Sequence, residues 1–226
     1  MASRSALPVA IVAATPVDTR LGCELLARHG FQTEGRSVSA TPKEQTLLQA
    51  FDRDGLSRRV IELIGSVPAV SAALIYCNSL SGAIDLERVR GEAGVPVATP
   101  LDLYGAVARG HRVVGVIAAN GQSLAHIERS VLRDNPDTRV VSHANLGIVE
   151  AIERGDPPGQ IVRALGLDRV LDAFMLQGAE RIILGCTHFT VLEGALGAWP
   201  VYNPDAELVS RLRSLLGSAR QLLQFT

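Results

Sequence analysis

The chain has 226 residues, of which 47% are hydrophobic and 4% aromatic, and its formal net charge is -1. That hydrophobic content can fill one compact core or the cores of two small lobes. There is no basic excess to neutralise phosphates, so we expect no nucleic-acid partner. Apolar runs such as 113–119 are too short to cross a bilayer, so we expect no membrane partner and a cytoplasmic location. We interpret the apolar stretch 6–15 as part of the mature fold, not as a signal peptide.

Short apolar strands alternate with helical segments along the chain. The predicted strands lie at 8–14, 72–76, 95–98, 112–118, 138–142 and 181–185. The predicted helices lie at 19–29, 43–65, 82–91, 121–133, 145–154, 159–178 and 205–223. The apolar residues are mostly aliphatic, which is typical of parallel strands buried under helices. The alternation therefore predicts an α/β fold with mainly parallel sheets flanked by helices.

The strand pattern occurs twice along the chain. In each half an apolar strand ends in two small residues and then a polar one, which is Thr15 in the first half and Asn120 in the second. A later apolar strand of each half ends at a cysteine, with 62 residues from Thr15 to Cys77 and 66 from Asn120 to Cys186. We interpret this as a weak internal repeat that predicts two similar lobes.

The repeat also predicts where the lobes begin and end. Lobe 1 comprises residues 1–98 and 204–226 and carries Cys77, and lobe 2 comprises residues 99–203 and carries Cys186. Because open α/β sheets bind ligands beyond the carboxyl ends of their strands, we expect each cysteine at a ligand-binding edge. Two similar lobes that face each other would place one thiol on each wall of a single cleft.

The numbers of cysteines and lysines limit the chemistry. An odd count of three cysteines argues against a disulfide framework, and no Cys-x-x-Cys pair occurs, so we expect no metal site. We interpret the third cysteine, Cys23, as a packing residue of a helix. The single lysine, Lys43, lies at the polar start of a predicted helix, where we expect it to be solvated. Pyridoxal phosphate requires a lysine for its Schiff base, so we expect no cofactor.

Cys77 directly precedes a predicted helix that Ser79 or Ser81 is expected to cap. A thiol at the amino end of a helix lies near the positive end of the helix dipole, which lowers the pKa of the thiol. The free backbone N–H groups of such an end also suit a carboxylate ligand.

Cys186 stands in a matching context. It follows Gly185, which permits close approach of backbone or ligand, and His188 comes two residues later and can polarise or orient the thiol. Either cysteine alone is equally consistent with a buried small hydrophobe. Two cysteines in matching contexts favour a functional interpretation.

Two segments resemble motifs of the aspartate/glutamate racemase superfamily. Residues 77–81, Cys-Asn-Ser-Leu-Ser, resemble its Cys-Asn-Thr-x-Ser motif. Residues 184–189, Leu-Gly-Cys-Thr-His-Phe, resemble its Leu-Gly-Cys-Thr-His-Tyr motif. The resemblance spans most of the chain. It implies two pseudosymmetric α/β lobes with the active site in the cleft between them, and an isomerase that racemises amino acids without a cofactor.

The resemblance also implies roles for individual residues. Cys77 and Cys186 would remove and return the Cα proton on opposite faces of the substrate, and His188 would assist Cys186. The carboxylate of the carbanion would be stabilised by backbone N–H groups and by three side chains, those of Asn78, Ser79 and Thr187.

The first loop departs from the glutamate racemase pattern. An aspartate of that family assists the first cysteine, but here Thr15 occupies its place and Asp18 is displaced by three residues. We favour a surface helix cap for Asp18, with a role as auxiliary acid as the alternative. Thr15 is a candidate for substrate binding. Residues 39–42, Ser-Ala-Thr-Pro, stand where that family has a substrate-binding Tyr-Gly pair.

A second acid of the family lies on a helix before the second cysteine. Glu150 is the better match and Glu153 its rival, and either residue can instead be a solvated helix residue. Asn120 caps the predicted helix at 121–133 and matches, in position, a loop that contacts the amino or carboxylate end of the substrate.

Three functional interpretations stay open. The first is a racemase or epimerase of a small carboxylate or amino-acid substrate, with a homodimer as one form of assembly. The second is another isomerase or lyase of the superfamily, similar to maleate isomerase or hydantoin racemase; the two intact cysteines argue against arylmalonate decarboxylase, which keeps one. The third is a non-catalytic protein that binds a ligand in the cleft, which the altered first loop favours and the retained cysteines oppose.

Overall fold

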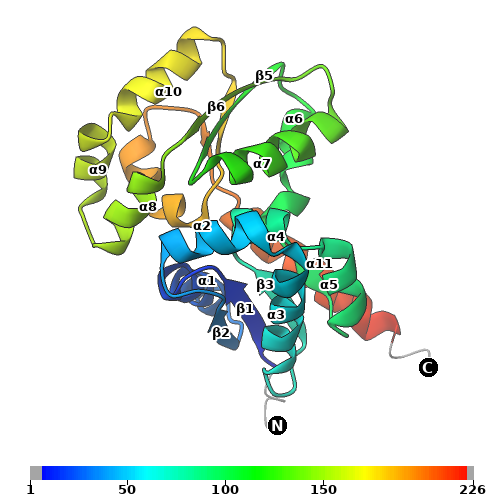
Figure 1. Ribbon diagram of the computed structural model, residues 1–226. Helices are drawn as coiled ribbons and strands as arrows, with labels where there is room; N and C mark the ends of the chain where they lie inside the picture. Colours follow the sequence, from blue (N-terminus) through cyan, green and yellow to red (C-terminus); the bar gives the residue numbers. More distant parts are fainter. Residues whose placement is uncertain (1–6, 223–226) are drawn as a thin grey trace. The chain divides into compact units, whose positions relative to one another are not determined.

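The computed structural model describes residues 7–222, which form two compact units (Figure 1). Unit 1 is Met1–Thr99 together with Asp205–Thr226, and unit 2 is Pro100–Pro204. The chain thus leaves unit 1 once and returns to it with its last helix. Residue 6 of the predicted first apolar stretch and residue 223 of the predicted last helix lie outside the described residues.

Unit 1 is built on a four-stranded parallel sheet in the order β2-β1-β3-β4. Its strands are β1 (Val9–Ala13), β2 (Thr33–Ser37), β3 (Ala72–Ile75) and β4 (Val97–Ala98). Its helices are α1 (Pro16–Arg28), α2 (Pro42–Phe51), α3 (Arg53–Gly65), α4 (Asn78–Ala83), α5 (Leu86–Glu92) and α11 (Asp205–Leu222). The last of these, drawn in red in Figure 1, contacts β3 and β4.

Unit 2 repeats this plan with a four-stranded parallel sheet in the order β6-β5-β7-β8. Its strands are β5 (Val113–Ala118), β6 (Arg139–Ala144), β7 (Arg181–Leu184) and β8 (Val201–Tyr202). Its α-helices are α6 (Tyr104–Ala108), α7 (Gly121–Asp134), α8 (Leu146–Glu153), α9 (Pro158–Ala164) and α10 (Leu167–Leu176). Two 3-10 helices, η1 (Pro100–Asp102) and η2 (Thr187–Leu196), complete it.

The two sheets have the same strand order, since in each the first strand of the unit lies between the second and the third. The α/β fold with two lobes and parallel sheets that the sequence predicts is therefore confirmed. The internal repeat has a structural counterpart in this shared order.

The central strands are apolar because helices cover both of their faces. In β5, Val114, Val116 and Ala118 pack in one core cluster with residues of α6 and α7. Ile117, on the opposite face, packs with residues of α8, α9, α10 and η2. A strand that is buried on both faces needs a continuous apolar sequence. This explains why β1, which is buried over Val9–Ala13, contains only apolar residues.

Two predicted helices are each divided into two. The predicted helix 43–65 is α2 and α3, because Asp52 ends the first and caps the second, with its carboxylate accepting a hydrogen bond from Gly55 N at 2.7 Å. The predicted helix 159–178 is α9 and α10, separated at Gly166, whose φ of 64° suits a residue without a side chain. Strand β2 and helix α6 were not predicted.

No helix among residues 7–222 is both long enough and apolar enough to span a membrane.

Candidate active site

In unit 1 the carboxyl ends of β1 and β3 are adjacent. These strands are paired in parallel with Val12 opposite Ile75, and Tyr76 N donates to Val12 O at 2.9 Å. Continuing this register by two residues brings Ala14 beside Cys77, and both residues belong to the same core cluster. The β1–α1 corner and the first cysteine therefore meet at one edge of the sheet.

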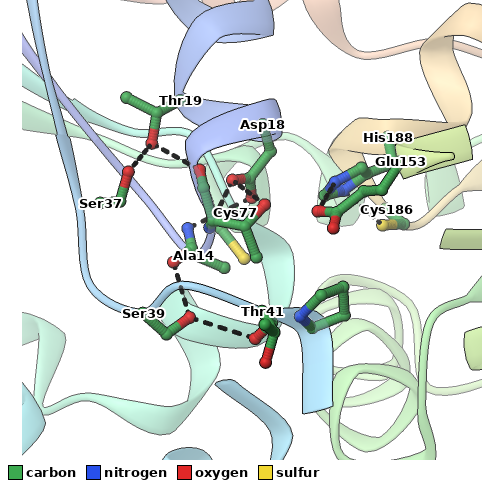
Figure 2. A network of polar contacts seen from close by, with 12 residues as sticks. Ala14, Asp18, Thr19, Ser37, Ser39, Thr41, Cys77, Glu153, Cys186 and His188 are labelled. Carbon is green, nitrogen blue, oxygen red and sulfur yellow. Dashed lines mark hydrogen bonds and ion pairs between the residues drawn. The ribbon is translucent and has the colours of Figure 1, made fainter. Parts of the chain in front are cut away.

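Asp18 holds the β1–α1 corner together from inside the protein (Figure 2). Its carboxylate accepts hydrogen bonds from Thr15 N at 2.7 Å, Ala14 N at 3.2 Å and Thr15 Oγ1 at 3.3 Å. Thr15 is the N-cap of α1 and forms a capping box with Asp18. The prediction of a helix cap is confirmed, but its placement on the surface is wrong, since Asp18 and Thr15 are both fully buried. The acid is buried because three donors satisfy it there.

The loop after β2 is fastened to the same corner. Ser39 donates from its backbone N and from its Oγ to Ala14 O, at 2.8 Å each. Thr19 Oγ1 and Ser37 Oγ lie 3.1 Å apart (Figure 2). Residues 39–42, which stand in place of the Tyr-Gly pair, are therefore held beside the carboxyl end of β1 and lead directly into α2.

Cys77 lies two residues beyond β3 and is itself the N-cap of α4. The prediction that Ser79 or Ser81 caps this helix is wrong, because the helix starts directly after the cysteine at Asn78. Ser81 Oγ instead donates to Cys77 O at 2.7 Å. Ser79 Oγ lies 3.4 Å from Cys77 Sγ, within hydrogen-bonding distance of sulfur. The thiol is only 6% exposed, and the neighbouring Asn78 is buried as well.

Gln49 of α2 is a residue that sequence reasoning missed. Its Nε2 donates to Ser79 Oγ at 2.8 Å, so it is joined to Cys77 through one hydroxyl. The only signal in the sequence is a glutamine four residues after Gln45 on an otherwise unremarkable helix. Which face of that helix is buried could not be known without the fold.

In unit 2 Cys186 occupies the position equivalent to that of Cys77. It lies two residues beyond β7 and is the N-cap of η2. Gly185, between the strand and the cysteine, donates its N–H to Ile117 O at 2.7 Å. A Cβ added to Gly185 would lie 2.8 Å from Ile117 O and 2.5 Å from Ile127 Cδ1. Close approach of β7 to β5 therefore requires glycine before this cysteine.

Cys186, His188 and Glu153 form a hydrogen-bonded chain (Figure 2). Cys186 Sγ lies 3.8 Å from His188 Nδ1, and His188 Nε2 lies 3.0 Å from Glu153 Oε1. His188 is 3% exposed, so its ring nitrogens are shielded from bulk water and lie against these neighbours. With Nε2–H donating to the carboxylate, Nδ1 can accept the thiol proton of Cys186.

Of the two acids considered on α8, the structure brings Glu153 to the histidine. Glu150, which matched the family better by sequence, is exposed. The reason is helical phase: Ile148, Val149 and Ala151 are buried, and Glu150 falls on the opposite side of the helix.

The other site residues predicted for lobe 2 lie at the same sheet edge. Asn120 follows β5 and is the N-cap of α7, where its Oδ1 accepts from Ser123 N at 2.9 Å. Ser123 Oγ in turn donates to Gly185 O at 3.3 Å, which ties the α7 start to the cysteine loop. Thr187 is 2% exposed, and its Oγ1 has no hydrogen-bond partner among residues 7–222.

The remaining candidates are placed away from these chains of contacts. Lys43 is exposed at the start of α2, as predicted. Cys23 is a half-buried residue of α1, and burial raises the pKa of its thiol. In the part of the chain that the structure describes, no group of three histidine, cysteine or acidic side chains is placed to hold a metal ion.

Known proteins resemble this chain in sequence. A sequence profile of the family described as Asp/Glu/Hydantoin racemase matches residues 45–211. The glutamate racemase of Pseudomonas aeruginosa is 32% identical over 161 residues, which are 67% of this chain and 60% of that protein. The glutamate racemase of Cupriavidus pinatubonensis is 33% identical over 128 residues, 55% of this chain and 46% of the relative. The chain thus spans about half to three fifths of the length of these relatives.

Solved structures share the fold. Glutamate racemase from Francisella tularensis, solved in complex with D-glutamate, has a TM-score of 0.73 at 20% identity, over 95% of this chain and 82% of that chain. An aspartate racemase homologue from Pyrococcus horikoshii has a TM-score of 0.65 at 17% identity, over 93% of this chain and 99% of the other.

Proposed function

Because the chain belongs to the Asp/Glu/Hydantoin racemase family, we propose that it is a cofactor-independent amino-acid racemase whose two bases are Cys77 and Cys186. One observation carries the proposal. The two cysteines occupy equivalent positions in two sheets of identical strand order, each two residues beyond its strand and at the cap of the next helix. A repeated fold that carries a thiol at the same place twice matches a reaction that needs one proton-transfer group for each face of a carbon atom.

The proposed reaction inverts Cα through a carbanion. The thiolate of one cysteine takes the Cα proton and becomes a thiol, and the electron pair of the C–H bond stays on the substrate. The thiol of the other cysteine then gives its proton to the opposite face, where a new C–H bond forms, and it becomes the thiolate. The two cysteines have exchanged protonation states, so the next turnover starts from the opposite enantiomer or after exchange of protons with water.

His188 supports Cys186 in this scheme. Its Nδ1 lies close enough to accept the proton of the thiol, and Glu153 at its Nε2 stabilises the resulting imidazolium. Thr187 is a candidate for binding the substrate carboxylate, since its buried Oγ1 has no hydrogen-bond partner among the described residues. Asn120, at the neighbouring start of α7, is the second candidate in this unit.

Cys77 is supported differently. Ser79 can donate a hydrogen bond to its thiolate, and Asn78 is the adjacent candidate for contact with the substrate. Asp18 and Thr15 satisfy each other at the β1–α1 corner, so we assign them to holding the loop beside Cys77.

Aspartate and glutamate are the first substrates to test, because the related proteins carry the names glutamate racemase and aspartate racemase homologue. The test follows Cα deuterium uptake and inversion by NMR in D2O, without pyridoxal phosphate. The panel holds both enantiomers of these and other amino acids, together with maleate and a substituted hydantoin to detect the alternative reactions of the family.

Wild type, Cys77→Ala and Cys186→Ala are compared, with Cys23→Ala as the matched control. We expect wild type and Cys23→Ala to invert one amino acid with deuterium uptake, and both other variants to lose inversion. Absence of exchange on every amino acid of the panel would contradict the proposed function. Inversion that persists in Cys77→Ala or Cys186→Ala would contradict the assignment of the bases.

A further inference from the structure

Helix α2 buries a polar face. Gln45 is 3% exposed and Gln49, one turn later on the same face, is half-buried, whereas Leu47 on the other side is 53% exposed. Leu48 of the same helix is partly buried against the core of unit 1, so the buried side of α2 is mixed rather than purely apolar. Burying a side-chain amide costs free energy unless the amide is hydrogen-bonded, and of these two glutamines Gln49 makes such a bond.

Gln49 contacts the hydroxyl that serves Cys77. Gln49 Nε2 donates to Ser79 Oγ at 2.8 Å, and Ser79 Oγ lies 3.4 Å from Cys77 Sγ. A serine hydroxyl has a single proton and can donate it in one direction. Because Ser79 Oγ accepts from the Gln49 amide, it can give its own proton to Cys77 Sγ, a contact in which the distance allows either atom to be the donor.

We propose that Gln49 is a positioning residue that aims the Ser79 proton at Cys77 Sγ and thereby stabilises the Cys77 thiolate. The chain Gln49–Ser79–Cys77 consists of a donor, a hydroxyl and an acceptor, in that order. A thiolate is the better acceptor of an O–H donor, so the arrangement favours the ionised form over the thiol. The consequence for catalysis rests on the proposed function, but the effect on the thiol does not.

The charged groups around Cys77 stay the same when Gln49 is replaced by a neutral residue. Asp18, at the β1–α1 corner, is the fully buried one. Other charged residues on neighbouring elements include Lys43 and Glu44 of α2, Asp85 after α4 and Asp205 of α11, and these four are exposed or half-buried. A change in the Cys77 pKa on neutral substitution would therefore report on the hydrogen-bonded chain rather than on a changed charge.

The test measures the pKa of Cys77 in the full chain carrying Cys23→Ala and Cys186→Ala, where Cys77 is the only thiol. Thiolate absorbance in the ultraviolet is titrated against pH without substrate. Gln49→Met, which keeps an unbranched side chain and removes the donor, should raise the pKa by about one unit, a roughly tenfold loss of thiolate at fixed pH. Ser79→Ala should raise it by a similar amount. Gln45→Met, on the same face one turn earlier, is the matched control and should leave it unchanged.

The double variant separates positioning from a merely structural effect. If Gln49 acts through Ser79, Gln49→Met adds nothing once Ser79→Ala is present. Should Gln49→Met fail to fold, Gln49→Leu is also neutral, also removes the donor and carries the same prediction.

Three results would overturn the inference. They are an unchanged pKa in Gln49→Met, a lowered pKa, which would mean that Ser79 donates to Gln49 in the native protein, and full additivity in the double variant. A chain that fails as a racemase but shows the predicted pKa shifts would contradict the proposed function and leave this inference standing.

Discussion

The two halves of the protein use one topology to support two thiols by different chemistry. Cys186 lies next to an ionisable pair, His188 and Glu153, whereas Cys77 lies next to the hydroxyl of Ser79. The residue before each cysteine differs as well, since Gly185 lets β7 approach β5 closely and Tyr76 reaches across to Asp205 of α11, with 2.8 Å between Oη and Oδ1. The sheet order is therefore duplicated while the side chains that adjust each thiol are specific to one half.

Among the residues that support the two thiols, His188 is expected to cause the largest loss of activity when it is replaced. His188→Asn removes the group that can exchange a proton with Cys186, so kcat/KM for racemisation should fall about 10²- to 10⁴-fold. The pKa of Cys77, titrated as above, should stay the same. Racemisation at the wild-type rate would mean that the imidazole is structural. Cys186 would then not depend on an ionisable neighbour, and the contrast with Cys77 would have no role in catalysis.

Replacing Glu153 should cost less, because it acts through the histidine. Glu153→Gln leaves a neutral partner for His188 Nε2 and weakens stabilisation of the imidazolium, and we expect a loss of about 10- to 100-fold in kcat/KM. Glu150→Gln, three residues earlier on the exposed side of the same helix, is the matched control and should be silent. Equal losses in both variants would show that the effect comes from the charge of α8 rather than from the hydrogen bond.

The glycine before Cys186 allows a test on stability. Gly185→Ala would force a Cβ against Ile117 O and Ile127, so we expect the free energy of unfolding to fall by about 1–3 kcal/mol. Gly91→Ala is the control, because a Cβ at this exposed helical position meets nothing within 4 Å and should be neutral or slightly stabilising. Denaturant unfolding measures both. Equal stability of Gly185→Ala and wild type would contradict the close approach of the strands.

Cys23 is the third thiol and belongs to neither the Cys77 nor the Cys186 chain of contacts. The smallest effect, a change in its rate of alkylation, is expected there. Burial raises the pKa of its thiol, more than the hydrogen bond from Thr33 lowers it, and the charge of Glu24 adds to the rise. A raised pKa means less thiolate at pH 8, so alkylation of Cys23 should be slower than that of a free thiol and should still accelerate above about pH 9. Mass spectrometry of the modified peptide follows this reaction. A plateau below pH 8 would contradict the direction of the shift.

Most of the fold was predictable because buried parallel strands are continuous apolar runs. Strand β2 escaped prediction because its sequence, Thr-Glu-Gly-Arg-Ser, is polar and half-buried throughout, as suits an edge strand. The break between α2 and α3 was missed because the helical period continues across Asp52, and only the cap geometry divides it.

The candidate site was predictable where a residue follows directly from its strand. Cys77, Cys186 and Asn120 each come two residues after a strand, and His188 comes two residues after Cys186, so their positions in the chain fix their places at the sheet edge. The choice between Glu150 and Glu153 depends instead on helical phase, which the buried Ile148, Val149 and Ala151 already encode. The contact of Gln49 with Ser79 depends on how α2 packs against α4, which no local pattern contains.

The most direct test of the two-thiol account follows hydrogen at Cα in the wild-type protein during the first turnovers in D2O, starting separately from each enantiomer of the substrate. If one cysteine takes the proton and the other supplies a different one, the product should carry deuterium while the remaining substrate keeps its hydrogen. Product that retains the original hydrogen, or substrate that gains deuterium as fast as product forms, would show that a single group serves both faces and would contradict the account.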